Sequence, residues 1–414
     1  MTRLNKILLG FVSLVFILLI SIQLRPVHYL LLNNSIIDST VSKFDKYSSL
    51  KESIYNRFPG FAYSYIGINI AGSEKDPEKI LKKINLYITN NVFQPSHYKP
   101  EDAAAIAQLE RGIGWCDQMS HILIRLADTH NLPGQIENLV DNSGSSPHTI
   151  ATVFLEDEWR PLDPTFGISF INDNDRLITK KEVCKNFQKY FEPSPGFNKI
   201  YCNDTLVFMK NEAAGEYSPI IFDAIKNQQA ISISTVSDPW RLIFKLPDFI
   251  GADLFIKLYL MTLESSLNDY EHLYKSARIF HILGKYEKAI KLYEKVVKEY
   301  PKATYEGQTL LYAVESSFWI GLARFQNGQY SQALNVFDNF INNTVVKVGS
   351  ESTDSSFGWS SYAKVYAGKS LLELERPEEA FSLLNDVAND NFSASAQTLA
   401  LRELFILKNL NNAY

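Results

Sequence analysis

An uncharged, apolar run near the amino terminus places the strongest constraint on how this chain folds. It covers the 18 residues from 7 to 24, between Lys6 and Arg25. A helix of that length is about 27 Å long, which is close to the thickness of the hydrocarbon core of a bilayer. The run therefore predicts one transmembrane helix over residues 7–24, with everything after it on one side of a membrane.

The charges that flank this run predict its orientation. Arg3 and Lys6 precede it without any acidic residue, so the positive-inside rule places residues 1–6 in the cytoplasm. The bulk of the chain is then extracytoplasmic, either periplasmic or on the cell surface. A cleaved signal peptide is the alternative interpretation, although Ser-Ile-Gln at 21–23 makes a poor cleavage site.

Charge and composition exclude several kinds of partner. The formal net charge is −5, and the part after residue 25 keeps 38 Lys and Arg against 46 Asp and Glu. No basic cluster stands out, which argues against nucleic acid as a partner. No Cys and His residues have the spacing of zinc ligands, and the sequence predicts no cofactor.

The chain has three cysteines, an odd number, so they cannot all pair within one chain. Cys184 and Cys202 lie 18 residues apart in a polar stretch. In an oxidising compartment they are the candidate pair for a disulfide, worth about 3 kcal/mol by loop-closure entropy. Two unpaired thiols are the alternative. Cys116 stands apart from both.

Local sequence signals predict helices ahead of the cysteine. Residues 26–60 suggest a helix that ends at Pro59-Gly60, and Asp76-Pro77 has the form of a helix start. A further helix is expected to begin at Cys116, because Gly112 and Gly114 allow tight turns directly before it. The apolar face of this helix repeats at offsets of 4, 7, 8 and 11, and its members are Trp115, Met119, Ile122, Leu123 and Leu126.

Two strands follow, and their pairing brings a histidine towards an aspartate. Residues 148–155 are rich in β-branched side chains, and residues 158–163 are interpreted as the returning strand. A two-residue turn between them places Ile150 opposite Asp163, so that His148 and Asp163 are diagonal neighbours on one face. A turn of odd length reverses this parity, so the prediction depends on the turn.

These side chains form a candidate catalytic site. A helix start and a nearby imidazolium both stabilise a thiolate, so Cys116 is the candidate nucleophile, His148 its base and Asp163 the orienting group. The backbone N–H of Cys116 is a candidate for half of an oxyanion hole, with Trp115 or the 90–100 segment for the other half. A cysteine that serves packing alone is the alternative.

Three segments resemble the transglutaminase-like superfamily, whose fold is papain-like. They are Gly-Ile-Gly-Trp-Cys-Asp-Gln at 112–118, a histidine that opens a strand, and Trp-Arg-Pro-Leu-Asp-Pro-Thr at 159–165. The resemblance covers about residues 75–170 and keeps the order Cys, His, Asp. It implies an α+β domain in which Cys116, His148 and Asp163 are the catalytic residues.

The carboxy-terminal third resembles tetratricopeptide repeats. Aromatic and small residues recur in three units, each of which contains an equivalent alanine: Ala289, Ala333 and Ala380. The resemblance implies an all-α helical array, with a polar insertion at 345–357 and a capping helix at 394–411. Stacked helix pairs leave a concave surface, and docking of a protein or peptide is the expected use. A structural scaffold or self-association is the alternative.

Together these signals predict the organisation and function of the chain. Its parts are a cytoplasmic end (1–6), a membrane helix (7–24), a transglutaminase-like thiol domain (40–215), a connecting helical region (216–267) and a tetratricopeptide-like array (268–414). We expect a membrane-anchored cysteine enzyme that acts on an amide or peptide carbonyl of a protein or peptide substrate, through a thioester, while the array docks a protein partner. The alternative is a non-catalytic assembly or scaffold protein that binds partners through the repeats.

Overall fold

The computed structural model describes residues 50–94, 105–140, 148–172, 174–179, 182–183, 207–210, 252–264, 267–303, 312–347, 353–390 and 393–411. The chain divides into two compact units. The first comprises residues 1–61 with 235–265, and the second comprises residues 62–234 with 266–414. The segment of the predicted thiol domain from residue 62 onwards and the predicted array therefore belong to one unit.

The predicted membrane helix at residues 7–24 lies outside the described residues, as do Cys184 and Cys202. Among the helices that are described, none combines the length and the hydropathy needed to cross a bilayer. The membrane anchor and the disulfide therefore stay predictions.

The described part of the first unit is a pair of helices. Residues 50–61 belong to α3 (Leu50–Ala71), and α11 is the helix Ala252–Glu264. The ring of Phe58 stacks on that of Tyr259 with centroids 3.6 Å apart. Both side chains are buried, so the aromatic pair joins the two helices.

The expected helix end at Pro59-Gly60 is wrong, because α3 continues through Pro59 to Ala71. Proline removes one backbone hydrogen bond from a helix interior and crowds the preceding turn. The neighbouring Phe58 and Phe61 are almost completely buried, and their burial favours the continuous helix. Tertiary packing thus outweighs the local preference for a helix end.

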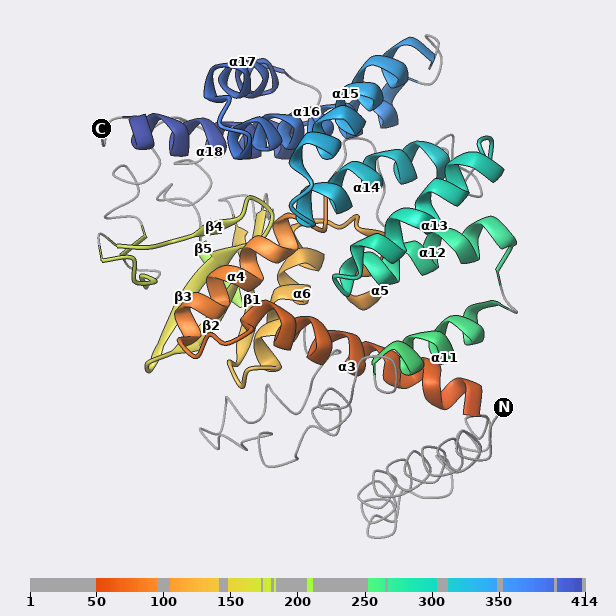
Figure 1. Cartoon of the computed structure of the whole chain (residues 1–414). Helices are drawn as coiled ribbons and strands as arrows, with labels where there is room; N and C mark the ends of the chain where they lie inside the picture. The colour runs from red at the N-terminus through yellow and green to blue at the C-terminus, as the bar shows by residue number, and fades with distance from the viewer. Residues whose placement is uncertain are drawn as a thin grey trace. The chain divides into compact units, whose positions relative to one another are not determined.

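The second unit contains one antiparallel sheet with the strand order β4-β3-β2-β1-β5 (Figure 1). The strands are Gly134–Val140 (β1), His148–Leu155 (β2), Glu158–Asp163 (β3), Ile168–Ser169 (β4) and Val207–Lys210 (β5). β2 is the central strand, and seven of its eight residues are buried. This burial explains why β2 is rich in β-branched residues.

The hairpin of β2 and β3 has the register that the sequence predicts. Leu155 pairs with Glu158, which leaves a two-residue turn at 156–157. Both turn residues have positive φ, 51° and 62°, as in the type I′ turns that match the twist of the strands. The parity of the hairpin therefore puts His148 and Asp163 on the same face of the sheet.

Three helices lie ahead of the sheet in sequence: α4 (Pro77–Thr89), α5 (Ala105–Arg111) and α6 (Cys116–Asp128). α4 begins where expected, because the Asp76 carboxylate accepts the backbone N–H of Glu78 at 2.9 Å. α6 also begins where expected, and it packs against β1 and β2 (Figure 1).

The array consists of consecutive helices that pack on one another. They are α12 (Asp269–Ile282), α13 (Tyr286–Glu299), α14 (Tyr312–Gln326), α15 (Tyr330–Lys347), α16 (Thr353–Glu373), α17 (Pro377–Ala388) and α18 (Ala394–Asn411). The capping helix thus lies where the sequence predicts it. The predicted polar insertion at 345–357 includes the end of α15 and the start of α16, and residues 348–352 between them lie outside the described residues.

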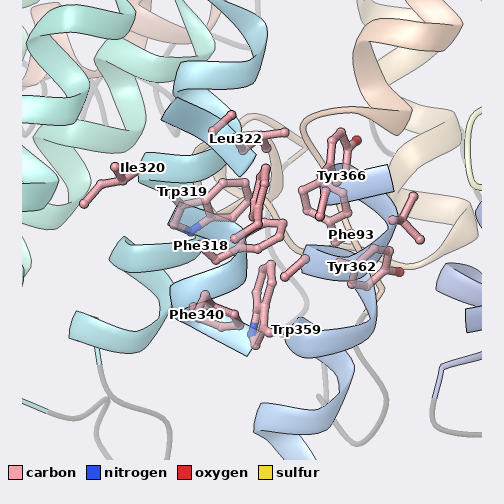
Figure 2. Packing of buried hydrophobic residues seen from close by; sticks show 14 of the residues in the cluster. Phe93, Phe318, Trp319, Ile320, Leu322, Phe340, Trp359, Tyr362 and Tyr366 are labelled. Carbon is pink, nitrogen blue, oxygen red and sulfur yellow. The ribbon is translucent and has the colours of Figure 1, made fainter. Parts of the chain in front are cut away.

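Helix α12 contacts α14, α14 contacts α16, and α16 contacts α18. We call the side of the array that these four helices form the inner face. The recurring alanines lie on α13, α15 and α17 and have no exposed surface: Ala289, Ala333 and Ala380. Small side chains at these positions allow close packing of neighbouring helices. Phe93 and Ile113 belong to the hydrophobic core of the array, although they precede it by more than 150 residues. Figure 2 shows Phe93 among the aromatic rings of this core.

Candidate functional site

His148 and Asp163 meet at one end of the β2–β3 hairpin. His148 is the first residue of β2 and Asp163 the last residue of β3. The Nε2 atom of His148 lies 2.6 Å from Oδ2 of Asp163, and both side chains are buried. The hairpin register alone creates this pair, so the predicted juxtaposition is confirmed.

The turn after β3 fixes the orientation of the Asp163 carboxylate. Its Oδ1 atom accepts the backbone N–H groups of Thr165 at 2.9 Å and of Phe166 at 3.3 Å. The hydroxyl of Thr89, at the end of α4, donates to the carbonyl of Pro164 at 2.8 Å. The carboxylate is therefore held on both sides, and α4 supports the turn that holds it.

The ring of Phe166 covers the imidazole of His148. Their centroids are 5.0 Å apart and their planes are inclined by 28°. This stacking restricts rotation of the imidazole and excludes water from it. His148 is therefore oriented by a carboxylate at its Nε2 atom and by an aromatic ring on its face.

Cys116 is the first residue of α6 and is half-buried. Its thiol hydrogen-bonds the side chain of His148. The helix start is capped by Gln118, whose Oε1 accepts the backbone N–H of Trp115 at 3.0 Å. The structure thus brings together the three predicted site residues from α6, β2 and β3.

The charge state of His148 follows from its neighbours. Burial lowers the pKa of His148, but the Asp163 carboxylate and the hydrogen bond to Cys116 outweigh burial and raise this pKa from 6.5 to about 10. The imidazole is therefore protonated at neutral pH.

Trp115 does not belong to the buried face of α6, contrary to the periodicity. Its side chain is 46% exposed, whereas Met119, the next member of the predicted face, is buried. Trp115 is the residue before the helix and has an extended backbone, so the helical period does not apply to it. The site therefore has an exposed aromatic ring next to the candidate nucleophile.

The candidate oxyanion donors differ in their hydrogen bonding. The N–H of Cys116 lies ahead of the helical ladder of α6 and stays a candidate. The N–H of Trp115 is a poorer candidate than expected, because it donates to Gln118. Of the 90–100 segment, residues 90–94 are bound to the array and the remainder lies outside the described residues.

Two residues that support the site, Phe166 and Thr89, are not among those that the sequence patterns indicate. Phe166 directly follows the Asp-Pro-Thr segment at 163–165, so the sequence could have indicated that it lies next to the site. Thr89 carries no comparable signal, because its bond to Pro164 spans 75 residues. In the part of the chain that the structure describes, no group of three or more His, Cys, Asp or Glu side chains is placed to hold a metal ion.

Comparison with protein families finds the tetratricopeptide repeat at residues 273–303 and 315–343. These ranges correspond to the pairs α12–α13 and α14–α15. Comparison with curated proteins and with solved structures finds no match. The repeats predicted for the first two units are thus confirmed, and such repeats are typical of proteins that bind other proteins. The matched ranges do not reach the sheet or Cys116.

Proposed function

We propose that this chain is a cysteine enzyme in which Cys116 attacks an amide or peptide carbonyl. The observation that supports this most is the series of side-chain contacts from Cys116 to His148 to Asp163. A nucleophile, a base and an orienting group in this order suit acyl transfer. The resemblance to the transglutaminase-like superfamily points to the same three residues.

The chemistry follows from the charges in the site. The Cys116 thiolate attacks the carbonyl carbon, and the backbone N–H of Cys116 stabilises the negative oxygen that forms. The C–N bond then breaks, and the leaving amine takes a proton from the His148 imidazolium. A thioester remains. Water or a second amine attacks it, His148 accepts the proton of the attacking group, and the Cys116 thiolate is released.

The resulting reaction is hydrolysis, deamidation or transamidation, depending on the acceptor. Trp115 offers an exposed ring directly beside the nucleophile, and we assign it to contact with the substrate. A protein or peptide side chain fits such a surface. The proposed site needs no cofactor, since the nucleophile, the proton donor and the orienting group all come from the chain.

Alkylation of the parent chain by iodoacetamide at pH 7, with mass spectrometric mapping, tests the proposal. The chain is first reduced and freed of reductant, so that Cys184 and Cys202 are thiols whatever their pairing. We expect Cys116 to react fastest, with these two cysteines as internal references. His148→Gln should slow this reaction by about tenfold or more, because the imidazolium is lost. His121→Gln, on the same helix as Cys116, serves as the matched control and should leave the rate unchanged. An undiminished rate in His148→Gln contradicts the proposal.

A non-catalytic assembly factor is the second candidate, and the tetratricopeptide match favours it. In that case the thiol domain is only a binding fold, and the repeats recruit a partner. Complementation of a deletion strain by Cys116→Ser separates the two candidates, once circular dichroism has shown that the variant is folded. Full complementation supports the assembly factor, and loss of complementation supports the enzyme.

The membrane anchor at residues 7–24 is part of the proposal and rests on the length and apolar character of that run. Extraction of membranes with alkaline carbonate tests it. We expect the full chain to stay in the membrane pellet and a chain that begins at residue 26 to be released. A full chain that is released as well contradicts the anchor.

A further inference from the structure

We propose that the inner face of the helical array is a brace that positions the nucleophile, with Phe93 and Arg278 as its main positioning residues. The inner face holds residues 90–94, and these residues hold the backbone that leads into Cys116. The inference rests on the proposed function, because it names what positions the proposed nucleophile.

The array binds both ends of the 90–94 stretch through side chains of its inner face. At one end, the carbonyl of Asn90 accepts the Gln326 amide at 2.9 Å, and the side-chain oxygen of Asn90 accepts the Tyr366 hydroxyl at 2.9 Å. At the other end, the hydroxyl of Tyr362 donates to the carbonyl of Gln94 at 3.2 Å and accepts its N–H at 3.1 Å. The stretch is therefore bound along its backbone.

Between these ends, the ring of Phe93 inserts into the aromatic core of the array (Figure 2). Its centroid lies 4.8 Å from that of Tyr362, 5.4 Å from that of Phe318 and 5.6 Å from that of Trp319. Phe93 is only 1% exposed. Edge-to-face and tilted contacts of this kind add to the burial of apolar area, so Phe93 anchors the stretch.

Arg278 of α12 binds the end of α5 and the 90–94 stretch together. Its Nε atom donates to the carbonyl of Glu110 at 2.8 Å, and Nη2 donates to the carbonyls of Leu109 and Asn91 at 3.3 and 3.4 Å. The guanidinium is buried and stacks on Trp319 at 3.5 Å from the ring centroid. The end of α5 presents carbonyl groups to a cation, and this arrangement is electrostatically favourable.

The 90–94 stretch is hydrogen-bonded to the backbone directly before Cys116. The N–H of Phe93 donates to the carbonyl of Gly112 at 2.9 Å, and the N–H of Gly114 donates to the carbonyl of Phe93 at 3.0 Å. Gly114 precedes Cys116 by two residues. A Cβ atom at Gly112 would overlap Arg278 and Trp319, so the absence of a side chain there allows the array to approach the backbone.

The capping helix also approaches the other end of the site. Gly167 follows the turn that holds Asp163, and its φ of 66° is favourable for glycine. A Cβ atom on Gly167 would come 2.8 Å from Nη1 of Arg402 in α18. The array therefore borders the segment before the nucleophile and the turn that holds the orienting carboxylate.

The inner face, which a helical repeat commonly offers to a peptide, is covered here by residues 90–94 of the same chain. The array is then part of the proposed enzyme.

The test uses the full chain with Phe93→Leu and Arg278→Met. Hydrogen exchange of peptides that span residues 108–116 reports on the amides of Gly112 and Gly114, and iodoacetamide labelling reports on Cys116. We expect exchange about tenfold faster and labelling about tenfold slower than in the parent, with unchanged far-ultraviolet circular dichroism. Val387→Ala is the control, because this side chain is buried in the same core on α17.

The outcomes separate the brace from the proposed function. Parental exchange of the 108–116 peptides in both variants overturns the brace, whatever the labelling shows. Equal changes in Val387→Ala also overturn the brace. They would mean that Phe93 and Arg278 act only by stabilising the fold as a whole. If Cys116 of the parent chain reacts like an ordinary thiol, the proposed enzymatic function is overturned. Hydrogen exchange of the 108–116 peptides then still tests whether the array holds this segment.

Discussion

The Nε2 atom of His148 lies 2.6 Å from the Oδ2 atom of Asp163, although the residues are 15 positions apart. A two-residue turn with positive φ at both positions sets the register that brings them together. The carboxylate then fixes the imidazole and favours its protonated form.

Replacement of Asp163 by asparagine removes the charge and keeps the shape. We expect slower labelling of Cys116 and a loss of about 1–3 kcal/mol in unfolding free energy, because the charge-assisted hydrogen bond is lost and burial then favours the neutral imidazole. Urea denaturation and iodoacetamide labelling measure the two effects. Asp157→Asn in the exposed hairpin turn is the control and should change neither quantity appreciably, since asparagine tolerates positive φ there.

The raised pKa of His148 predicts how stability depends on pH. The folded state binds this proton more tightly than the unfolded state, whose histidine has a pKa near 6.5. The stabilisation is thus complete below about pH 6.5 and is lost as pH rises towards about 10. Urea denaturation between pH 6.5 and 10 should show a decline in the parent that is weaker in His148→Gln. Identical slopes in the two proteins contradict the assignment.

His281 predicts a dependence of the opposite sign. Burial, followed by the nearby Arg278 charge, lowers the pKa of His281 well below 6.5. Its contribution to stability is therefore present above about pH 6.5 and is lost as pH falls, since the unfolded state takes up the proton first. Thermal unfolding at pH 7 and pH 5 should show a smaller acid-induced decrease in His281→Gln than in the parent. An equal decrease argues against a neutral buried His281.

Gly112→Ala tests how closely the array approaches the backbone. Gly112 and Gly284 have similar φ values of 73° and 71°, so alanine costs about 1–2 kcal/mol at either position. At Gly112 the new Cβ also overlaps Arg278 and Trp319, whereas it meets nothing within 4 Å at Gly284. We expect a further loss of about 1–3 kcal/mol in unfolding free energy for Gly112→Ala. Equal losses for both variants contradict the close approach.

The parts of the fold that depend on local signals could be predicted from the sequence. The start of α6 at Cys116 and the hairpin register depend on neighbouring residues, and both are confirmed. The pairing of His148 with Asp163 needs only that register. Two local predictions were nevertheless wrong: Pro59 does not end α3, because packing favours the longer helix, and Trp115 is exposed, because it precedes the helix.

The contacts of the array with residues 90–94 and with the backbone before Cys116 could not be predicted from the sequence. Phe93 meets Trp319 across more than 200 residues, and neither residue carries a signal for the other. Such pairs depend on how the inner face of the array packs against the residues before α6. Gly112 shows the same limit: a tight turn explains this glycine, but the overlap with Arg278 and Trp319 emerges only from the packing.

The rate of Cys116 alkylation at pH 7 in the parent chain, compared with the rates in His148→Gln and Asp163→Asn, tests the central claim most directly. The proposal makes the reactivity of Cys116 depend on the imidazole of His148 and on the carboxylate that orients it. We predict a rate about tenfold lower in His148→Gln than in the parent, and a lower rate in Asp163→Asn as well. Equal rates in the three folded proteins would contradict the account.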